Sequence, residues 1–177
     1  MSELLLTKTD VLMSIHPHWC DLIFNEKKTL EIRKSIPKLK PPFRVLVYCT
    51  RPKTTDENLW VTVPGGYNYL GNYHIIGEFV CSQAIDMRDV GGDDFERKSC
   101  LTLEDWLKYT EGHKGVVWGW EIKTPKLYPV PLSLEDFGLK RPPQSWQYVN
   151  VPFDPFRANS LFHRVGETSN NTESKGE

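Results

Sequence analysis

The sequence predicts an α+β fold, in which short strands joined by turns share one core with two short helices. Thirteen prolines and twelve glycines separate its short apolar runs, a pattern typical of strands and tight turns. Two segments instead carry helix-start signals, one near residue 17 and one near residue 102. At 177 residues the chain is long enough for one well-filled core. We therefore expect one domain over residues 1–165, with its core at about 11–150.

The first elements are a buried strand at residues 11–15 and a helix that begins at Pro17. Proline suits the first helical turn because the N–H that it lacks has no partner there. The apolar residues that follow recur at helical spacing and predict the side that faces the core: Trp19, Leu22 and Ile23. Asn25 accepts the left-handed conformation in which helices often end, so we expect the helix to stop there.

Residues 28–34 form the next predicted strand and gather four functional side chains. In a strand, Thr29, Glu31 and Arg33 share one face, opposite two aliphatic side chains. Lys28 falls on the aliphatic side by alternation, so it joins the polar group only if the chain is still turning into the strand there. Two interpretations remain open: the wall of a cleft, or a charged sheet edge in which Glu31 pairs with Arg33 or Lys28.

These residue types bind anions. The guanidinium of Arg33 can clamp a phosphate or carboxylate with two hydrogen bonds, and Lys28 adds a compact charge. Burial beside other cations would push Lys28 toward its neutral form, in which it can act as a base. Residues 26–53 carry nine Lys/Arg against two acids, a net charge of +7, and the remainder carries a net charge of −8. This asymmetry fits either a localised anion site or a solvated basic loop.

The middle of the chain combines a regular strand with an irregular stretch. Residues 44–50 are nearly continuously apolar and β-branched, which predicts a central strand. Residues 51–73 are the least regular stretch and are predicted to form a mobile loop. Its aromatic residues are Trp60, Tyr67, Tyr69 and Tyr73. They form either a lid that stacks on a planar ligand or a local cluster that anchors the loop.

A second carboxylate stands within the next predicted strand, residues 74–81. Strict alternation places Glu78 on the same face as the apolar Ile76 and Val80. A carboxylate on an apolar face is paired, protonated or catalytic. Glu78 is therefore a second candidate for proton transfer.

The C-terminal half is predicted to hold a second helix and three extended segments. Thr102 caps this helix and Gly112 ends it. Its apolar face comprises Leu103, Trp106 and Leu107. The extended segments are predicted at residues 116–122, 127–134 and 142–149. Residues 166–177 have no apolar side chains and are predicted to form a disordered tail.

Several aromatic side chains lie in the late strands. Trp118 and Trp120 alternate and therefore share one face, so both can line one cavity wall. Together with Trp146 and Tyr148, they are the kind of side chains that stack on nucleobases. They equally suit a core, and we expect at least one of them to be buried there.

Composition and motifs exclude several function classes. Four widely spaced cysteines predict reduced thiols and a cytoplasmic protein. His16, His18 and Cys20 alternate, but Pro17 would splay them and no second ligand pair follows, so we predict no metal. No phosphate-binding glycine loop is present, and no cofactor is predicted. The first residues have too short an apolar run for a signal peptide, and no stretch is long enough to span a membrane.

Two stretches resemble the signature of the ASCH family, which runs from an Ile-x-Pro turn through a helix to Gly-x-Lys-x-x-Glu-x-Arg. They are residues 14–19, Ser-Ile-His-Pro-His-Trp, and residues 27–33, Lys-Lys-Thr-Leu-Glu-Ile-Arg. Lys28, Glu31 and Arg33 match the Lys, Glu and Arg of the pattern.

Further matches extend the resemblance over roughly residues 11–123. Residues 76–79, Ile-Gly-Glu-Phe, resemble the family's later Gly-Glu strand, and Trp118 resembles its aromatic late strand. Residues 142–146, Pro-Pro-Gln-Ser-Trp, resemble an extension of phage- and prophage-type members. The resemblance implies a PUA-like, partly closed β-barrel of mixed, mostly antiparallel strands with two short helices.

The chain departs from the family pattern at important positions. Glu26 stands where the family has a glycine. Small ASCH amidohydrolases, which remove an acyl group from N4-acetylcytidine, use a lysine, a threonine and a glutamate. Lys28 matches the lysine, but the threonine falls at Glu31 and the glutamate near Ser99. The resemblance therefore does not carry that activity over to this chain.

These observations favour a monomeric binding module for RNA or for a modified nucleoside or nucleotide, with no membrane partner. The predicted ligand-binding residues are Lys28, Thr29, Glu31, Arg33, Trp118 and Trp120. The alternative is a hydrolase acting on an acylated nucleoside or RNA. In that case Lys28 would serve as the base or activate the nucleophile, Glu31 or Glu78 would carry protons, and Arg33 would stabilise the oxyanion.

Overall fold

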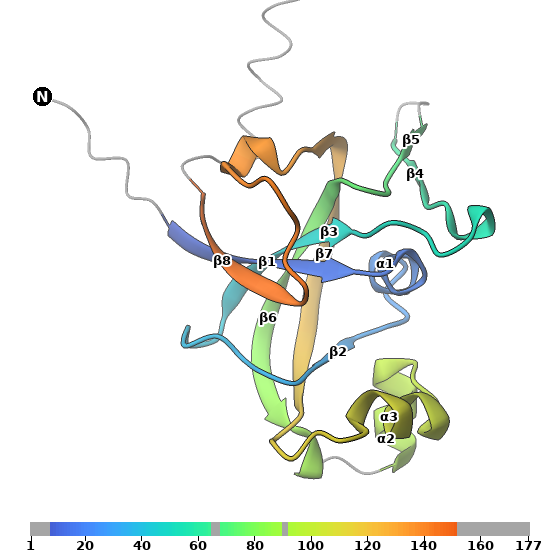
Figure 1. Cartoon of the computed structure of the whole chain (residues 1–177), viewed down its shortest axis with the longest axis vertical. Coiled ribbons are helices and arrows are strands. Elements are labelled where there is room, and N and C mark those ends of the chain that lie inside the picture. Colours follow the sequence, from blue (N-terminus) through green and yellow to red (C-terminus); the bar gives the residue numbers. More distant parts are fainter. Residues whose placement is uncertain (1–7, 65–67, 90–91, 152–177) are drawn as a thin grey trace, which may run out of the picture.

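A computed structural model describes residues 8–64, 68–89 and 92–151. The predicted domain end at residue 165 and the predicted tail at 166–177 lie outside these residues. The described part contains a mixed sheet that curls into a half-barrel and three α-helices packed around it (Figure 1). The predicted α+β class and partly closed barrel are therefore confirmed, although these described residues hold one helix more than expected.

Six strands form the main sheet in the order β2-β7-β6-β3-β1-β8. Their bounds are β1 Lys8–Ile15, β2 Leu30–Arg33, β3 Phe43–Cys49, β6 Ile75–Asp86, β7 Trp118–Leu132 and β8 Trp146–Val151. β1 and β3 are parallel, and the other neighbours are antiparallel. β2, which carries the polar cluster, is consequently an edge strand, next to β7.

Three helices and a hairpin accompany this sheet in the described residues. The helices are α1 Pro17–Phe24, α2 Gly92–Ser99 and α3 Leu103–Thr110. A small hairpin, β4 Trp60–Thr62 with β5 Asn68–Leu70, lies within the stretch predicted as a loop. Tyr69 of this hairpin packs against the core, and its hydroxyl donates to the backbone carbonyl of Tyr128. Tyr69 therefore anchors the segment, which is one of the two roles predicted for these aromatic residues; the other was a lid over a ligand.

The core divides into clusters on the two faces of the sheet. In β1 and β3, alternate residues enter the barrel interior against α1, and the residues between them enter a second cluster on the outer face. The interior cluster includes Val11, Met13, Ile15, Val45, Val47, Cys20 and Ile23. The outer cluster includes Leu12, Leu46, Tyr48 and Tyr128. This packing fixes the ends of β1 and α1, which border the site.

The end of α1 corrects one prediction. Asn25 is not left-handed (φ −91°), whereas Glu26 is, with φ 57°. The N–H of Glu26 donates to the carbonyl of Ile23, and the N–H of Lys27 donates to that of Leu22. These two bonds form a Schellman motif, which places the left-handed residue one position after the helix cap. Glu26 thus adopts the backbone conformation that glycine would take most easily.

Other predicted elements also differ from the structure. The strands predicted at 116–122 and 127–134 are the single strand β7, with Thr124 in a left-handed conformation (φ 46°) within it. α2 was not predicted, because its sequence is mostly charged and has a weak apolar pattern. In α3, Trp106 packs inward, but Leu103 and Leu107 are exposed rather than forming a core-facing side.

Candidate functional site

The aliphatic side chains of β2 fix its orientation. Leu30 and Ile32 are buried in a small cluster between the sheet and the helices α2 and α3. Gly119 of β7 lies opposite Ile32, and a Cβ there would be 2.9 Å from Leu30 Cδ1 and 2.6 Å from Met87 Sδ. Leu30 therefore packs directly against the backbone of Gly119, where a side chain would clash. Burial of this face directs Glu31 and Arg33 to the opposite side, as alternation predicts.

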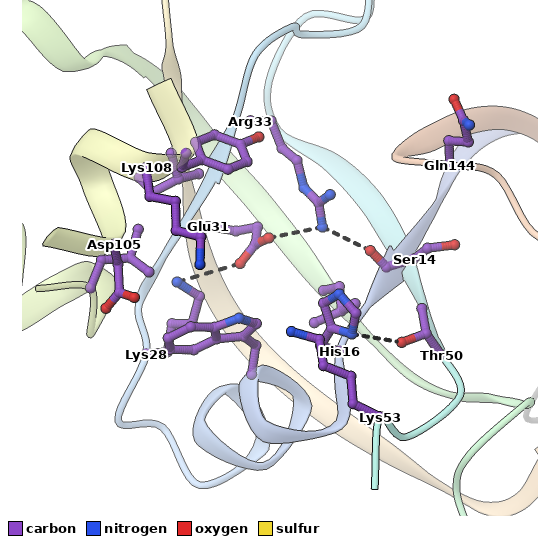
Figure 2. A pocket seen from close by; sticks show the side chains of 15 residues that line it. Ser14, His16, Lys28, Glu31, Arg33, Thr50, Lys53, Asp105, Lys108 and Gln144 are labelled. Carbon is purple, nitrogen blue, oxygen red and sulfur yellow. Dashed lines mark hydrogen bonds and ion pairs between the residues drawn. The ribbon is translucent and has the colours of Figure 1, made fainter. Parts of the chain in front are cut away.

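Three charged side chains meet on that side (Figure 2). Arg33 Nη2 lies 2.8 Å from Glu31 Oε1, and Lys28 Nζ lies 3.5 Å from Glu31 Oε2. Lys28 precedes the first residue of β2, so its side chain is free of the strand's alternation. The chain is still turning at this point, which is the condition under which Lys28 joins the polar cluster. Glu31 is therefore shared by the two cations.

Distant segments hold the two cations in place. Lys28 Nζ donates to the backbone carbonyl of Ser99 at 2.6 Å and lies 5.0 Å from the centre of the Trp19 ring. Arg33 Nη2 donates to the carbonyl of Ser14 at 2.9 Å, and its Nη1 donates to Ser145 Oγ at 3.3 Å. Chain segments from α1, α2, β1 and the start of β8 thus converge on one short strand.

Backbone strain gathers beside Lys28. Glu26 lies two residues before it, and Cys100 follows the residue whose carbonyl Lys28 binds. Both are left-handed (φ 57° each), a conformation that costs a non-glycine residue about 1 kcal/mol. Strained residues of this kind cluster at functional sites, because a defined geometry is maintained there at the expense of stability.

The polar cluster lines a cavity of about 620 Å³ between β2, α1, α3 and the end of β1 (Figure 2). This volume is within the usual range for small-molecule sites. Four cations line it against two acids. The cations are Lys28, Arg33, Lys53 and Lys108, and the acids are Glu31 and Asp105. The cavity is therefore locally positive although the chain as a whole is almost neutral.

Burial alters proton affinity at the cavity floor. The side chain of Lys28 is only 2% exposed, and this desolvation lowers its pKa, although Glu31 partly opposes the change. His16, which lines the cavity and lies 3.2 Å from Thr50 Oγ1, also has a lowered pKa. Burial is the main cause for His16, and the nearby Lys53 adds to it. Both groups lose their protons more readily than in water.

Three predicted ligand-binding residues lie away from this cavity. Thr29 bonds through its backbone to Lys98 and Ile122 and does not line the cavity. Trp120 is fully buried in the interior cluster, and Trp118 packs partly buried against that cluster. Both tryptophans therefore belong to the core. Alternation placed them on one face correctly, but that face is the barrel interior.

Glu78 is on the other face of the sheet. A bulge between Ile75 and Gly77 adds one residue to β6, so Ile76 enters the interior cluster while Glu78 lies opposite Leu46 of the outer cluster. Strict alternation from Ile76 was therefore wrong. Glu78 Oε2 accepts a 2.6 Å hydrogen bond from the Tyr128 hydroxyl and lies 3.5 Å from Arg44 Nη1. It does not join Lys28, Glu31 and Arg33.

The cavity contains residues that sequence reasoning did not select. Trp19 and Tyr109 supply its aromatic rings, in place of the late-strand tryptophans. Lys53 and Lys108 lie at its edge and are exposed. Trp19 was predicted to face the core, whereas Tyr109 and Lys108 belong to a helix whose link to β2 is visible only in three dimensions. The sequence offered one indication of these cavity residues: Trp19 and Lys28 both lie in the stretches that resemble the ASCH signature.

The described residues also bear on two other features, a metal site and a membrane span. Within residues 8–64, 68–89 and 92–151, no group of three or more His, Cys, Asp or Glu side chains is arranged to hold a metal ion. None of the helices in the described segments has the length and apolarity needed to cross a membrane.

Comparison with solved structures identifies the fold. The crystal structure of the ASCH protein from Zymomonas mobilis superposes with a TM-score of 0.59, at 19% identity, over 87% of this chain and 94% of that chain. A Tyr-to-Phe variant of the same protein gives a TM-score of 0.62, at 18% identity, over 86% of this chain and 96% of that chain. The chain has an ASCH-type fold. No protein-family model matches the sequence, and no curated protein sequence matches it.

Proposed function

We propose that this ASCH-type protein binds RNA or a modified nucleoside or nucleotide in the Lys28–Arg33 cavity. The observation that carries this proposal is the convergence of Lys28, Glu31 and Arg33 on one cavity that also contains the Trp19 and Tyr109 rings. Cations bind phosphate, and aromatic rings stack on bases. An anionic ligand with a planar group satisfies both features.

Each side chain has a distinct role in this proposal. Lys28 supplies a desolvated positive charge at the floor, where electrostatic attraction is stronger than in water. Glu31 holds both cations in place and can accept a hydrogen bond from an N–H group of a base. Lys53 and Lys108 are exposed at the edge and attract the phosphate backbone. Trp19 and Tyr109 provide the flat apolar surfaces for the base.

The charge around the cavity favours one path for an RNA strand. The connector at residues 34–42 carries three lysines, residues 138–146 carry Lys140 and Arg141, and neither segment contains an acid. The two segments are in contact, since Trp146 Nε1 donates to Ser35 Oγ at 3.0 Å. The hollow beside α1, in contrast, is lined by three acids, Asp21, Asp56 and Glu57. A phosphate backbone would therefore leave over the 34–42 side.

A hydrolase remains the second candidate, because the buried Lys28 has a lowered pKa at the cavity floor. Its proton carrier would be Glu31, since Glu78 lies on the opposite face of the sheet. Ser99, near the position of the glutamate in the amidohydrolases, does lie against Lys28, but it offers a backbone carbonyl rather than a carboxylate. This difference favours binding over hydrolysis.

Fluorescence anisotropy with a labelled single-stranded RNA tests the binding proposal. The wild-type chain should bind with an affinity that falls steeply with salt, and Lys53→Gln and Lys108→Gln should each reduce the salt slope by about 0.7 per lost phosphate contact. Lys123→Gln is the matched control, because Lys123 is exposed, pairs with Glu121 and lies outside the cavity. Competition by mononucleotides distinguishes a strand from a free nucleotide. Unchanged binding and salt slope in Lys28→Ala and Arg33→Ala would refute the proposal.

Mass spectrometry of acylated nucleosides and short RNAs after incubation with the protein tests the hydrolase alternative. Turnover that disappears in Lys28→Ala would support it. Turnover that persists unchanged in this variant would remove Lys28 from the catalytic role.

A further inference from the structure

The outward side of α3 presents an apolar surface to solvent. Leu103 and Leu107, one helical turn apart, are 63% and 59% exposed. Trp106, on the neighbouring flank of α3, packs against Phe95 of α2, with ring centres 5.0 Å apart. Thr102 and Asp105 form a complete capping box, so the helix is stabilised at its first turn. The exposed leucines therefore stand on a well-formed element.

Two hollows adjoin at Leu103. One, of about 330 Å³, lies between α2 and α3 and includes Phe95, Trp106 and Met87. The other is shallow and open to solvent, and it runs along α3 beside Leu103 and Leu107. Together they form a groove with apolar residues at its centre, which we call the α3 groove. Single exposed leucines need no explanation, but two leucines beside apolar hollows are typical of an interaction surface.

The rim of the α3 groove is acidic. Asp93, Glu96, Glu104 and Glu111 line it, and Lys108 is its one basic residue among the described side chains. None of these four carboxylates forms an ion pair within the described segments. The groove therefore combines an apolar floor with unpaired negative charge.

We propose that the α3 groove docks a basic amphipathic helix of a partner protein. Apolar side chains spaced at i, i+3 and i+4 on such a helix would enter the two hollows, and its Lys and Arg side chains would meet the acidic rim. A second copy of this chain fits poorly, because two acidic rims would face each other. RNA is disfavoured on this face for the same electrostatic reason.

The groove borders the cavity without belonging to it. Asp105, Lys108 and Tyr109 of α3 line the cavity, whereas Leu103, Glu104 and Leu107 line the groove. A partner on the groove would contact the same helix that supplies the cavity's Lys108 and Tyr109. The proposal stands on the exposed leucines and acidic rim, and it holds whether or not the cavity binds RNA.

A peptide titration followed by ¹H–¹⁵N NMR tests this proposal on the full chain. The probes are a synthetic amphipathic Leu/Lys helix, its Leu/Glu counterpart and a Leu/Lys peptide of scrambled order. The Leu/Lys helix should shift amide signals of α2 and α3, and the other two peptides should leave them unchanged. Shifts confined to other parts of the chain, or equal binding of the Leu/Glu helix, would overturn the proposal.

Variants at exposed positions sharpen the same experiment. Leu103→Ser with Leu107→Ser should weaken Leu/Lys binding at least about tenfold. Val130→Ser is the matched control, because Val130 is 45% exposed on β7 and does not line the groove. Glu104→Lys with Glu111→Lys should reverse the preference toward the Leu/Glu helix.

Three further outcomes would contradict the assignment. Unchanged affinity in the double leucine variant, with a wild-type melting curve, would show that the leucines are not the contact. Signals of α3 that shift with protein concentration in the absence of peptide would assign the groove to a second copy. Crosslinks from α3 to residues 152–177 of the same chain would assign it to the chain's own C-terminal segment.

Discussion

Two partly buried charge networks lie on opposite faces of the same sheet, and they differ in whether a cavity adjoins them rather than in how their charges pair. On one face Glu31 holds Lys28 and Arg33. On the other, Arg44 Nη2 lies 2.5 Å from Asp10 Oδ2 and Arg44 Nη1 lies 3.5 Å from Glu78 Oε2. The first network opens into a cavity, whereas the second lies beside the outer apolar cluster.

Both networks leave one buried polar atom without a hydrogen-bond partner in the described part of the chain, Arg33 Nε in the first and Asp10 Oδ1 in the second. Burial and pairing alone therefore do not distinguish a binding site from a structural ion pair. The distinguishing features are the cavity and the aromatic rings beside it. On these grounds we propose that the first network binds a ligand and that the second contributes to stability.

The largest expected effect on stability belongs to the second network. Asp10 is fully buried, and Asp10→Ala would leave Arg44 with the longer contact to Glu78 as its ion pair among the described residues. We expect a loss of about 3 kcal/mol in the free energy of unfolding, because one partner of a buried pair is removed. Urea denaturation measures it. A loss below about 1 kcal/mol would place this network among weak surface pairs.

Lys28→Met should instead reduce RNA affinity strongly and change stability little. RNA affinity should fall at least about tenfold, or about 1.4 kcal/mol, because the desolvated charge is lost. The free energy of unfolding should change by less than about 1 kcal/mol, since methionine fills a similar volume and Glu31 keeps Arg33. Anisotropy and urea denaturation on the same preparation measure both. If stability collapses while affinity per folded molecule is retained, Lys28 is structural.

The pH dependence of stability separates the networks further. Because burial lowers the pKa of Lys28 below 10.5, its unfolded form binds more protons between the lowered value and 10.5. The stability penalty of Lys28 is therefore full below its folded pKa and disappears as the pH rises toward 10.5. The stability of Lys28→Met relative to wild type should decline over this range. A difference that is constant with pH would contradict the lowered pKa.

A smaller effect is expected from relieving backbone strain beside Lys28. Glu26→Gly should raise the free energy of unfolding by about 0.5–1 kcal/mol, because glycine adopts a positive φ without steric cost. Glu26→Ala is the control, since alanine keeps the strain and removes the carboxylate. Equal melting temperatures for the glycine and alanine variants would show that strain at this position contributes nothing measurable.

The part of the site that is local in sequence was predictable, and the part assembled over long distances was not. Alternation in residues 29–33 correctly placed Glu31 and Arg33 on one face, and the turn before β2 explains why Lys28 joins them. The Ser99 carbonyl that holds Lys28 is 71 residues away in sequence. No pattern in the sequence indicates that pairing, because it depends on how α2 packs against β2.

Fold predictions failed where a strand departs from regular alternation. The bulge at Ile76 reversed the expected face of Glu78, and the left-handed Thr124 made one long strand look like two. Neither Ile76 nor Thr124 is itself a glycine or proline, although each directly precedes one, Gly77 and Pro125. For Trp118 and Trp120 the alternation was predicted correctly but the surroundings were not. Alternation shows that two side chains share a face, but it does not show whether that face lines a cavity or the core.

One matched pair of variants tests the central claim most directly. Arg33→Met and Arg44→Met make the same chemical change in the two networks, and the affinity of each folded variant for single-stranded RNA is measured at one salt concentration. We predict that Arg33→Met loses at least about tenfold in affinity, while Arg44→Met is less stable but binds as tightly as wild type. Equal affinities in the two variants, or a greater loss in Arg44→Met, would contradict the assignment of binding to the Lys28–Arg33 cavity.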